Sequence, residues 1–539
     1  MPSTFTSKFG TNYGADDAEM GDIRKLISGP NARIVALDDE IRLLRQRIDN
    51  LLKERGELAS FVNNHTALLA PIRRLPRDVV EELFVACLPS RNCAMSFTEA
   101  PLLLGRVCSS WRTIAWSTPR LWSQLHISQP IMYVEDRPAE DRLRMWHEEA
   151  LALLRDAFIA WLSRSGDCNL SISVQCSQYP SPSDIFGPDK QGIVAALLPF
   201  AARWEHIRIM DITPEDFIRL QDLPALPRLR SFDLTEGYYR ELSQPEFWHA
   251  HNIFRAPNIT RLRLSGTRFD PLLLPLRWES LTDLSIFHSS PPNMPFYGLS
   301  SILEILTRCP NLVTLCSWLN TFTGGVPVLN HDSVRHTQLR GLQLDFGGDI
   351  YPLVEQVCSH LVLPGLEHLH FMGRAQSEDR TISTHEELTS FLGVMEHLTS
   401  VEIFLDLFTR DGFVALLSRL PASVKQLHLF PDSATWVADR EFIDYEILEL
   451  LSRPGVIIDT LSFARCTSFT DEQLLAFIHA RMASACPLKQ VSVHFKREAE
   501  RDILPELLAA YGGHLTVELD YRQRPVRQRL FPFQGLQED

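Results

Sequence analysis

The chain carries ten cysteines but none of the close spacings through which cysteines bind zinc or form a redox pair. There is no Cys-x-x-Cys sequence and no Cys/His set at zinc-finger spacing, so a structural zinc site and thiol–disulfide chemistry are not expected. Scattered cysteines are typical of small core residues in a reduced compartment. The sequence therefore predicts a cytoplasmic and/or nuclear protein without a bound metal.

Long apolar stretches are also missing. The longest, Ile193–Ala202, has about half the length that a membrane-spanning helix needs. Residues 1–20 lack the basic end and apolar stretch of a secretory signal. We therefore expect no membrane partner and no leader of this kind.

Basic residues are outnumbered, with 53 Lys and Arg against 67 Asp and Glu and a net charge of −14. Proteins bind nucleic acids nonspecifically through positive charges that neutralise phosphates, so a nucleic-acid partner is not expected. Hydrophobic residues make up 45% of the chain and charged residues 22%, which is ordinary for a folded protein with a sizeable core.

Motifs of the common enzyme classes are absent as well. The sequence contains no GxxxxGK[ST] phosphate loop, no GxGxxG after a strand, no HExxH and no GxSxG. His368 and His370 form a His-x-His pair that can contribute to a zinc site, but no third Cys or His lies near them in sequence. We interpret them as exposed strand residues. The chain is expected not to be an enzyme and to need no cofactor.

A heptad pattern is the first feature that is present. Residues 1–30 are polar and are predicted to be disordered. Over residues 31–70, apolar residues recur at alternating steps of three and four, with charged residues between them and a break at Arg55. The stripe consists of Ile34, Leu37, Ile41, Leu44, Ile48, Leu51, Leu58 and Val62. It predicts a long helix that either forms a homodimer through residues 34–62 or packs as an amphipathic helix on its own protein.

A repeated string dominates residues 168–521. The pattern LxxLxL, with other apolar residues allowed, recurs at intervals of about 28 residues, and apolar stretches at helical spacing such as Leu299–Leu306 lie between the strings. A strand followed by a helix cannot bury its own apolar face, so such units stack into a solenoid. The Asn that usually follows the string is mostly missing. The repeats are therefore divergent, and a generic α/β domain with parallel strands is the alternative.

Side chains alternate along each string, so the Leu positions point inward and the residues between them face outward on the concave sheet. These outward positions carry charges, histidines and amides, which suits the binding of a protein. The residues predicted to bind a substrate are Arg261, Arg263, Arg340, His368, His370, Gln426 and His428.

Residues 71–125 contain a third, non-repeated pattern. It begins with Leu-Pro-Arg-Asp at 75–78, continues through an apolar helix that ends in Leu83-Phe84, and resumes after a polar loop at 89–100. Val-Cys-Ser-Ser-Trp-Arg then occupies 107–112, and Leu121-Trp122 closes the segment. So many large apolar residues in a unit of this size, with little polar cover, are typical of an interface.

This order of residues resembles the F-box, although the loop at 89–100 is longer than the usual first connection of that family. With the heptad helix before it and the divergent repeats after it, the chain resembles the expanded F-box families of mushroom-forming fungi. The resemblance implies a substrate-recognition subunit of an SCF-type (Skp–cullin–F-box) E3 ubiquitin ligase. Its box would bind the Skp-type adaptor, and through it the cullin and RING subunits, while the repeats would bind a protein substrate. The implied adaptor-binding residues are Leu75, Pro76, Val79, Leu83, Phe84, Val107, Cys108, Trp111, Leu121 and Trp122.

The expected fold class is therefore mixed: an all-α F-box preceded by a long, coiled-coil-like helix and followed by an α/β leucine-rich-repeat solenoid. The expected divisions are a disordered N-terminus at 1–30, the heptad helix at 31–70, the F-box at 71–125, a connecting helical segment at 126–167, the solenoid at 168–521 and a tail at 522–539. The first half of the box is expected to dock, whereas Trp111 and Trp122 are also candidates for the core that joins the box to the repeats. A leucine-rich-repeat scaffold not engaged in ubiquitination, with a box that only caps the solenoid, remains the alternative.

Overall fold

A computed structural model describes fifteen stretches of the chain and divides it into two compact units, Met1–Leu83 and Phe84–Asp539. The described residues are 3–129, 140–176, 192–212, 214–236, 248–249, 251–267, 270–288, 298–320, 333–347, 350–373, 385–430, 443–453, 456–466, 469–495 and 497–521. The predicted tail at 522–539 and part of the predicted connecting segment, residues 130–139, lie outside these stretches.

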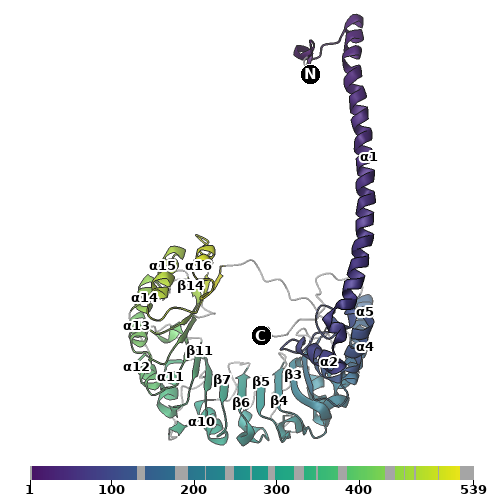
Figure 1. The fold of residues 1–539 in the computed structure, drawn as a ribbon. Helices are drawn as coiled ribbons and strands as arrows, with labels where there is room; N and C mark the ends of the chain where they lie inside the picture. Colours follow the sequence, from purple (N-terminus) through teal and green to yellow (C-terminus); the bar gives the residue numbers. More distant parts are fainter. Residues whose placement is uncertain are drawn as a thin grey trace. The chain divides into compact units, whose positions relative to one another are not determined.

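The first unit is built on one long helix, α1 (Asp17–Leu69), which follows the short 3-10 helix η1 (Thr6–Lys8) (Figure 1). α1 begins well before residue 31, so the last part of the segment predicted to be disordered is helical. The Asp16 carboxylate accepts a hydrogen bond from the backbone N–H of Glu19 at 2.8 Å, and the Glu19 carboxylate accepts one from the N–H of Asp16 at 3.4 Å. This reciprocal cap satisfies backbone donors that the helix start leaves unpaired. The unit continues through η2 (Pro71–Arg74) into α2 (Arg77–Ala86).

The second unit contains a 14-stranded parallel sheet whose strands lie side by side in the order of the sequence. Its strands are β1 (Gln124–Ser128), β2 (Leu170–Gln175), β3 (Trp204–Ile212), β4 (Ser231–Glu236), β5 (Arg261–Thr267), β6 (Asp283–His288), β7 (Thr314–Asn320), β9 (Gly341–Gly347), β11 (His368–Gly373), β12 (Ser400–Phe404), β13 (Gln426–Phe430), β14 (Thr460–Cys466), β15 (Gln490–Phe495) and β16 (Thr516–Asp520). The short strands β8 (Val334–Arg335) and β10 (Leu361–Val362) pair separately. Each predicted string from Trp204 onward forms a strand, so the repeat solenoid is confirmed.

Helices cover the outer face of this sheet, whereas the strands line the inner side of the curved array (Figure 1). The outer helices are α10 (Leu299–Arg308), α11 (Ile350–His360), α12 (His385–Gly393), α13 (Arg410–Ser418), α14 (Tyr445–Leu451), α15 (Asp471–Met482) and α16 (Leu504–Tyr511). In the earlier repeats the strands are connected by the short helices α7 (Ile193–Leu197) and α8 (Pro214–Arg219) and by the 3-10 turns η4 (Leu198–Arg203), η5 (Leu220–Asp222), η7 (Asn252–Arg255), η8 (Pro271–Leu273) and η9 (Trp278–Ser280). The 3-10 turn η10 (Leu405–Leu407) follows β12.

The core lies between the sheet and the helices. Leu262 on β5 is in register with Leu284 on β6, which is in register with Leu315 on β7, and all three are at most 2% exposed. Each such leucine contributes about 2 kcal/mol through burial. Because neighbouring repeats supply most of the burial, the array is stable only as a stack.

The sheet begins earlier than predicted. β1 lies at the end of the segment assigned to the box, and α5 (Glu140–Arg164) joins it to β2. β1 and α5, the described elements of the predicted connecting segment, are therefore the first part of the solenoid rather than only a helical connection.

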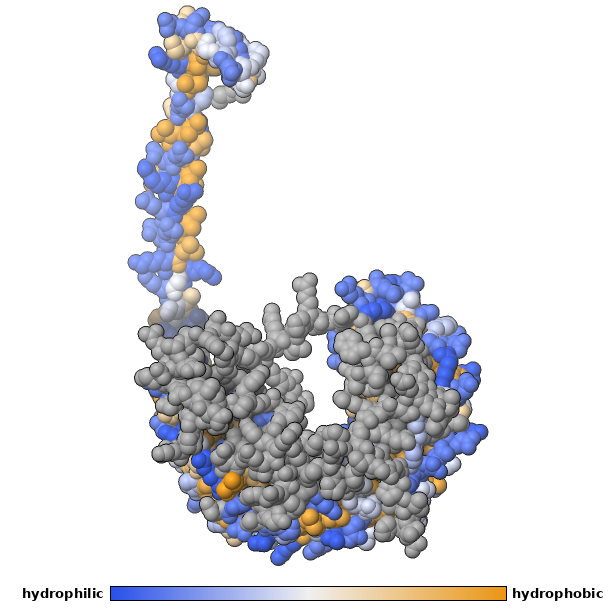
Figure 2. Space-filling view, turned by 180° about the vertical axis from the view of Figure 1, so that it is seen from behind, coloured by the Kyte–Doolittle hydropathy of each residue, from blue (hydrophilic) through white to orange (hydrophobic). Residues whose placement is uncertain are grey.

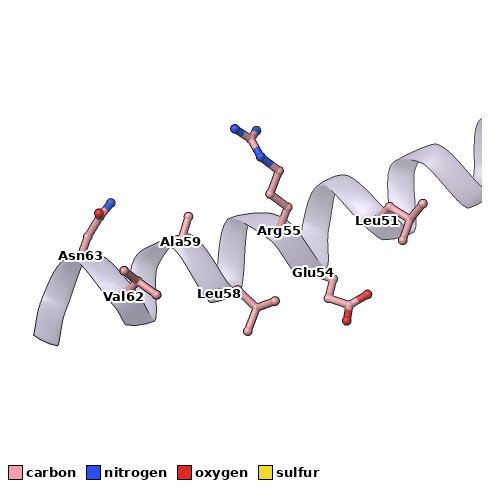
Figure 3. Close-up of a pocket in the computed structure, with 7 residues that line it drawn as sticks. All are labelled: Leu51, Glu54, Arg55, Leu58, Ala59, Val62 and Asn63. Carbon is pink, nitrogen blue, oxygen red and sulfur yellow. The ribbon is translucent and has the colours of Figure 1, made fainter. Parts of the chain in front are cut away.

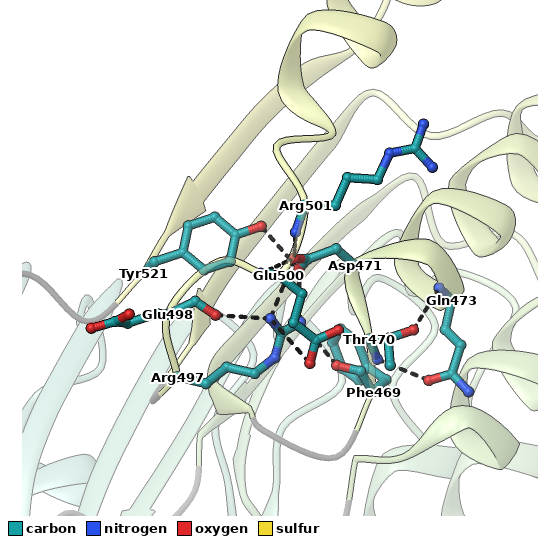
Figure 4. Close-up of polar contacts among 9 residues, drawn as sticks. All are labelled: Phe469, Thr470, Asp471, Gln473, Arg497, Glu498, Glu500, Arg501 and Tyr521. Carbon is teal, nitrogen blue, oxygen red and sulfur yellow. Dashed lines mark hydrogen bonds and ion pairs between the residues drawn. The ribbon is translucent and has the colours of Figure 1, made fainter.

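The C-terminal end of the array is held by Asp471, whose side chain is 1% exposed (Figure 4). Its carboxylate accepts hydrogen bonds from the Arg497 guanidinium at 2.7 Å, the backbone N–H groups of Glu500 and Arg501 at 2.8 and 2.9 Å, and the Tyr521 hydroxyl at 3.0 Å. Burial acts to raise the pKa of Asp471, but the donors around the carboxylate outweigh it and hold this pKa below its usual value. One carboxylate thus ties the start of α15 to the loop before α16 and to the residue after β16.

Candidate functional site

The first candidate surface is on α2, which carries apolar side chains on two faces. Val80 and Phe84 are one helical turn apart and are 4% and 1% exposed. Val79 and Leu83 are also one turn apart but are 40% and 43% exposed, and Leu75, just before the helix, is 38% exposed. Pro76 is exposed beside Leu75. One apolar face of α2 is therefore buried, and the other, Leu75–Pro76–Val79–Leu83, is open; we call this open face the α2 face.

Phe84, predicted to bind the adaptor, is instead part of the core of the second unit. Its ring lies 4.8 Å from that of Trp111, centroid to centroid, at 58°. Phe84 is 1% exposed, so its ring packs inside the second unit and is not part of the open α2 face.

Leu121 and Trp122 are buried as well, at 0% and 1% exposure. The Trp122 indole donates a hydrogen bond to the Ala115 carbonyl at 2.8 Å, and its ring packs edge-on against Trp161 of α5 at 4.8 Å. Both residues lie in η3 (Pro119–Trp122), immediately before β1. They anchor the start of the solenoid, which is the core position expected as the alternative for Trp122.

The remaining predicted adaptor residues lie around the junction of α3 (Leu104–Val107) and α4 (Ser109–Ser117). Val107 is 58% exposed, Cys108 is exposed, and Trp111 is half-buried beneath Phe84. The Cys108 sulfur accepts a hydrogen bond from the Trp111 N–H at 3.4 Å, which makes Cys108 the N-cap of α4. Its place in the sequence pattern is explained by this cap.

The long loop at 89–100 pairs with the edge of the sheet. The backbone N–H of His126 donates a hydrogen bond to the Cys93 carbonyl at 2.8 Å. Ala94 and His126 thereby form an isolated parallel β-bridge. The Asn92 amide bonds the hydroxyls of Ser171 and Ser173 on β2, at 2.8 and 3.1 Å. The extra length of this loop thus covers β1, which is otherwise the open edge of the sheet.

The second candidate surface is the inner face of the sheet, where polar side chains stand in register from strand to strand. One row runs through consecutive sheet neighbours. We call it the polar row; its members are Ser173, Arg208, Asp233, Arg263, Ser285, Cys316, Gln343, His370, Glu402, His428, Ser462 and Ser492.

The structure places six of the seven predicted substrate residues on this face. Arg263, His370 and His428 belong to the polar row. Arg261, His368 and Gln426 lie two residues earlier on the same strands and are exposed. The predicted alternation of inward and outward side chains therefore agrees with the register of the strands.

Arg340 is the exception, because it precedes β9. Its guanidinium donates to the carbonyls of Thr337 and Gly365, at 3.2 and 2.8 Å, and lies 3.4 Å from the Glu367 carboxylate. Arg340 thus links the turn before β9 to the turn before the neighbouring strand β11. Its expected place among the outward residues of the strands is therefore not observed.

The polar row contains two clusters of charged or titratable side chains. On β3 to β5, Asp233 lies between Arg208, 3.1 Å away, and Arg263. Burial raises the pKa of Asp233, and the two arginines offset part of this effect. Arg208 and Asp233 occupy outward positions of their strands but were not among the predicted residues, because their pairing depends on β3 and β4 being neighbours in the sheet.

On β11 to β13, the group consists of His370, Glu402 and His428. His370 Nδ1 lies 2.8 Å from a Glu402 carboxylate oxygen, and this hydrogen bond lowers the pKa of Glu402. Burial lowers the pKa of His428, against the opposing effect of Glu402. The His370 ring is nearly parallel to Phe430, with 6.3 Å between centroids. The face here combines a charge, imidazole rings and an aromatic ring, a mixture that suits the recognition of a protein segment.

The described residues contain no group of three or more His, Cys, Asp or Glu side chains arranged to hold a metal ion. Among their helices, none has both the length and the apolar character that a membrane span requires.

No known protein-family model matches the chain, and no curated protein matches its sequence. Distantly similar solved structures include three that each share 14% sequence identity with this chain. The TLR13–ssRNA13 complex is matched over 59% of this chain with a TM-score of 0.30, and the match spans only 45% of that chain. A protein from Bacteroides fragilis is matched over 56% of this chain and 68% of its own, with a TM-score of 0.26. The yeast Rad7 and Elc1 complex is matched over 70% of this chain and 94% of its own, with a TM-score of 0.29. At these scores the similarities support no functional assignment.

Proposed function

We propose that the chain is a non-catalytic substrate-recognition subunit of an SCF-type ubiquitin ligase. In this proposal the α2 face binds a Skp-type adaptor, and through it the cullin and RING subunits, while the inner face of the solenoid binds a protein substrate. The observation that carries the proposal is the open apolar face of α2, because it lies in the part of the chain that resembles an F-box.

The α2 face has the properties of a docking surface. Leu75, Val79 and Leu83 follow one another at steps of four and are each about two-fifths exposed. Each leaves apolar area in water, and a partner that covers it gains about 25 cal/mol for every Å² removed from solvent. Exposed clusters of this kind mark interaction sites more often than isolated apolar residues do.

The inner face supplies a separate surface for the substrate. It extends over fourteen strands, and none of the described helices of this unit covers it in Figure 1. It presents both cationic and anionic side chains, such as Arg208, Arg263 and Glu402. Solenoids use such extended concave faces to bind proteins. The absence of a recognised catalytic motif in the sequence agrees with a role in presentation rather than chemistry.

A repeat scaffold without a role in ubiquitination is the second candidate. It is favoured by the second half of the segment, where loop 89–100 pairs with β1 and Trp122 is buried against α5. These contacts are those of a cap on the sheet. A cap on the sheet does not explain why the α2 face is apolar and exposed, so we place this candidate second.

Co-purification of the full chain with a Skp-type adaptor tests the proposal. The Val79→Glu/Leu83→Glu variant places charges on the α2 face and is expected to lose adaptor recovery by at least about tenfold, as for two interface side chains worth over 1 kcal/mol each. Leu153→Glu is the matched control, since Leu153 is 71% exposed on α5, away from this face in sequence. Failure of the unmodified chain to retain the adaptor, or equal recovery by both variants, would favour the scaffold instead.

A further inference from the structure

We propose that α1 forms a parallel, in-register, two-stranded coiled coil with a second copy of this chain over residues 34–62. The proposal is independent of the ligase role, because it rests on the side chains of α1 alone. It selects one of the two interpretations of the heptad pattern and adds the orientation and register of the pair.

The apolar side chains of α1 gather along one side of the helix (Figure 2). They are between 40% and 59% exposed: Ile34, Leu37, Ile41, Leu44, Ile48, Leu51, Leu58 and Val62. About four heptads of exposed Ile, Leu and Val form a seam long enough for a coiled coil. The ion pair between Asp39 and Arg42, at 2.6 Å, lies on the opposite side of the helix, as expected for solvent-facing positions.

The two kinds of seam position carry different residues. With Ile34 at position a, the a positions are Ile34, Ile41, Ile48, Arg55 and Val62, and the d positions are Leu37, Leu44, Leu51 and Leu58. β-Branched residues at a with leucine at d favour two parallel strands over trimers or tetramers. Over these heptads every a position is Ile or Val, except Arg55, and every d position is Leu.

Charges beside the seam indicate a parallel arrangement. In a parallel pair, each g position faces the e position five residues later on the other helix. Arg33 would then face Asp38 of the second copy, and Glu40 would face Arg45 of the second copy. Both contacts join opposite charges, and by symmetry each occurs twice. Pairs of this type set orientation and partner choice more than they add stability.

Arg55 explains the break in the stripe. A shallow hollow on α1 is lined by Leu51, Glu54, Arg55, Leu58, Ala59, Val62 and Asn63, and Figure 3 shows Arg55 and Ala59 projecting on one side of the helix and Glu54 and Leu58 on the other. In register, the two Arg55 side chains meet at the seam, where each can reach Glu54 of the second copy. A single charged a position specifies register at some cost in stability, since a slip by one heptad would bury Arg55 against Ile48 or Val62 of the second copy.

The mass of the full chain in solution tests the pairing. Light scattering after gel filtration is expected to give twice the 61.5 kDa mass of one chain. Leu44→Lys, at a d position, should give the single-chain mass. Leu43→Lys is the matched control, because Leu43 is the adjacent leucine, 63% exposed against 56% for Leu44, and lies outside the seam. A single-chain mass for the unmodified protein, or equal masses for the two variants, would overturn the proposal; unchanged thermal unfolding of the second unit would show that the variants fold.

Disulfide trapping tests the orientation. Leu37→Cys should form a covalent dimer on mild oxidation, above the background of the native cysteines, because the two position-37 side chains meet in a parallel pair. Val35→Cys, exposed but outside the seam, should not. An antiparallel pair would separate the two position-37 residues by roughly 30 Å along the axis, so a dimer by mass without this cross-link would overturn the parallel assignment.

Charge reversal tests the register. Glu40→Arg should increase dissociation because it opposes Arg45 of the second copy, and Glu40→Arg/Arg45→Glu should restore the dimer. An equally weakened double variant would contradict the g-to-e contacts.

Discussion

The rings of Phe84 on α2 and Trp111 on α4 lie 4.8 Å apart, centroid to centroid, so the two halves of the segment that resembles a box pack on each other. Phe84→Ala is therefore expected to destabilise the second unit by about 3–5 kcal/mol, the usual cost of removing a fully buried ring. Urea unfolding of the full chain measures this. Val79→Ala, on the exposed face of the same helix, should change stability far less, and a similar loss for both variants would show that the two faces are not distinct.

Asp471 supports a second prediction on stability. Asp471→Ala leaves Arg497, which is 16% exposed, without its carboxylate and removes the acceptor for two backbone N–H groups. Removing one partner of a buried ion pair costs about 3–5 kcal/mol, and proteolysis of the C-terminal repeats should accelerate accordingly. Glu472→Ala is the control, because its side chain is 77% exposed and adjacent in sequence. Equal proteolysis of both variants would refute the role of Asp471 as a clamp.

Ser317 occupies an inward position on β7, in register with Ile286 and Leu344, and is fully buried. Its hydroxyl has no hydrogen-bond partner among the residues that the structure describes. Ser317→Ala should therefore raise the unfolding free energy by about 1 kcal/mol, since it removes a desolvated polar group. Thermal unfolding checks this against Ser462→Ala on the polar row, which should give no gain. A lower melting temperature for Ser317→Ala would indicate that the hydroxyl is bonded in solution.

The unfolding free energy is expected to decrease in acid because of His428. Burial lowers its pKa below 6.5 in the folded chain, so the unfolded state binds a proton at higher pH than the folded state does. The unfolding free energy should then fall as the pH drops below about 6.5. His428→Gln should make this decline shallower, as measured by urea unfolding at about pH 7.5 and 5.5. An unchanged slope would mean that His428 titrates alike in both states.

Much of the fold could be predicted from periodicity alone. Strings such as that around Leu262 and Leu264 have a period of two that fixes both the strand and its inward face. β1 was not predicted, because its apolar pair Leu125 and Ile127 straddles the end of the segment that resembles a box, which was placed at residue 125. The start of α1 carries a readable signal, the Asp16–Glu19 cap, which the polar composition of residues 1–30 obscured.

The candidate site was harder to predict, for a physical reason. α2 has apolar residues on two faces, and a sequence cannot tell which face the rest of the chain covers. From the sequence, Phe84 and Leu83 are therefore equally good candidates for adaptor contact, whereas the structure buries Phe84 and exposes Leu83. Arg208 and Asp233 were missed because their pairing depends on which strands are neighbours.

Hydrogen exchange of the full chain, with and without a Skp-type adaptor, shows which residues the adaptor covers. If the α2 face binds the adaptor, peptides covering residues 75–86 should exchange more slowly in the complex, while peptides from β11 to β13 remain unchanged and free for a substrate. Protection confined to the inner face of the sheet, or none at residues 75–86 when the adaptor is bound, would show that the α2 face does not bind the adaptor.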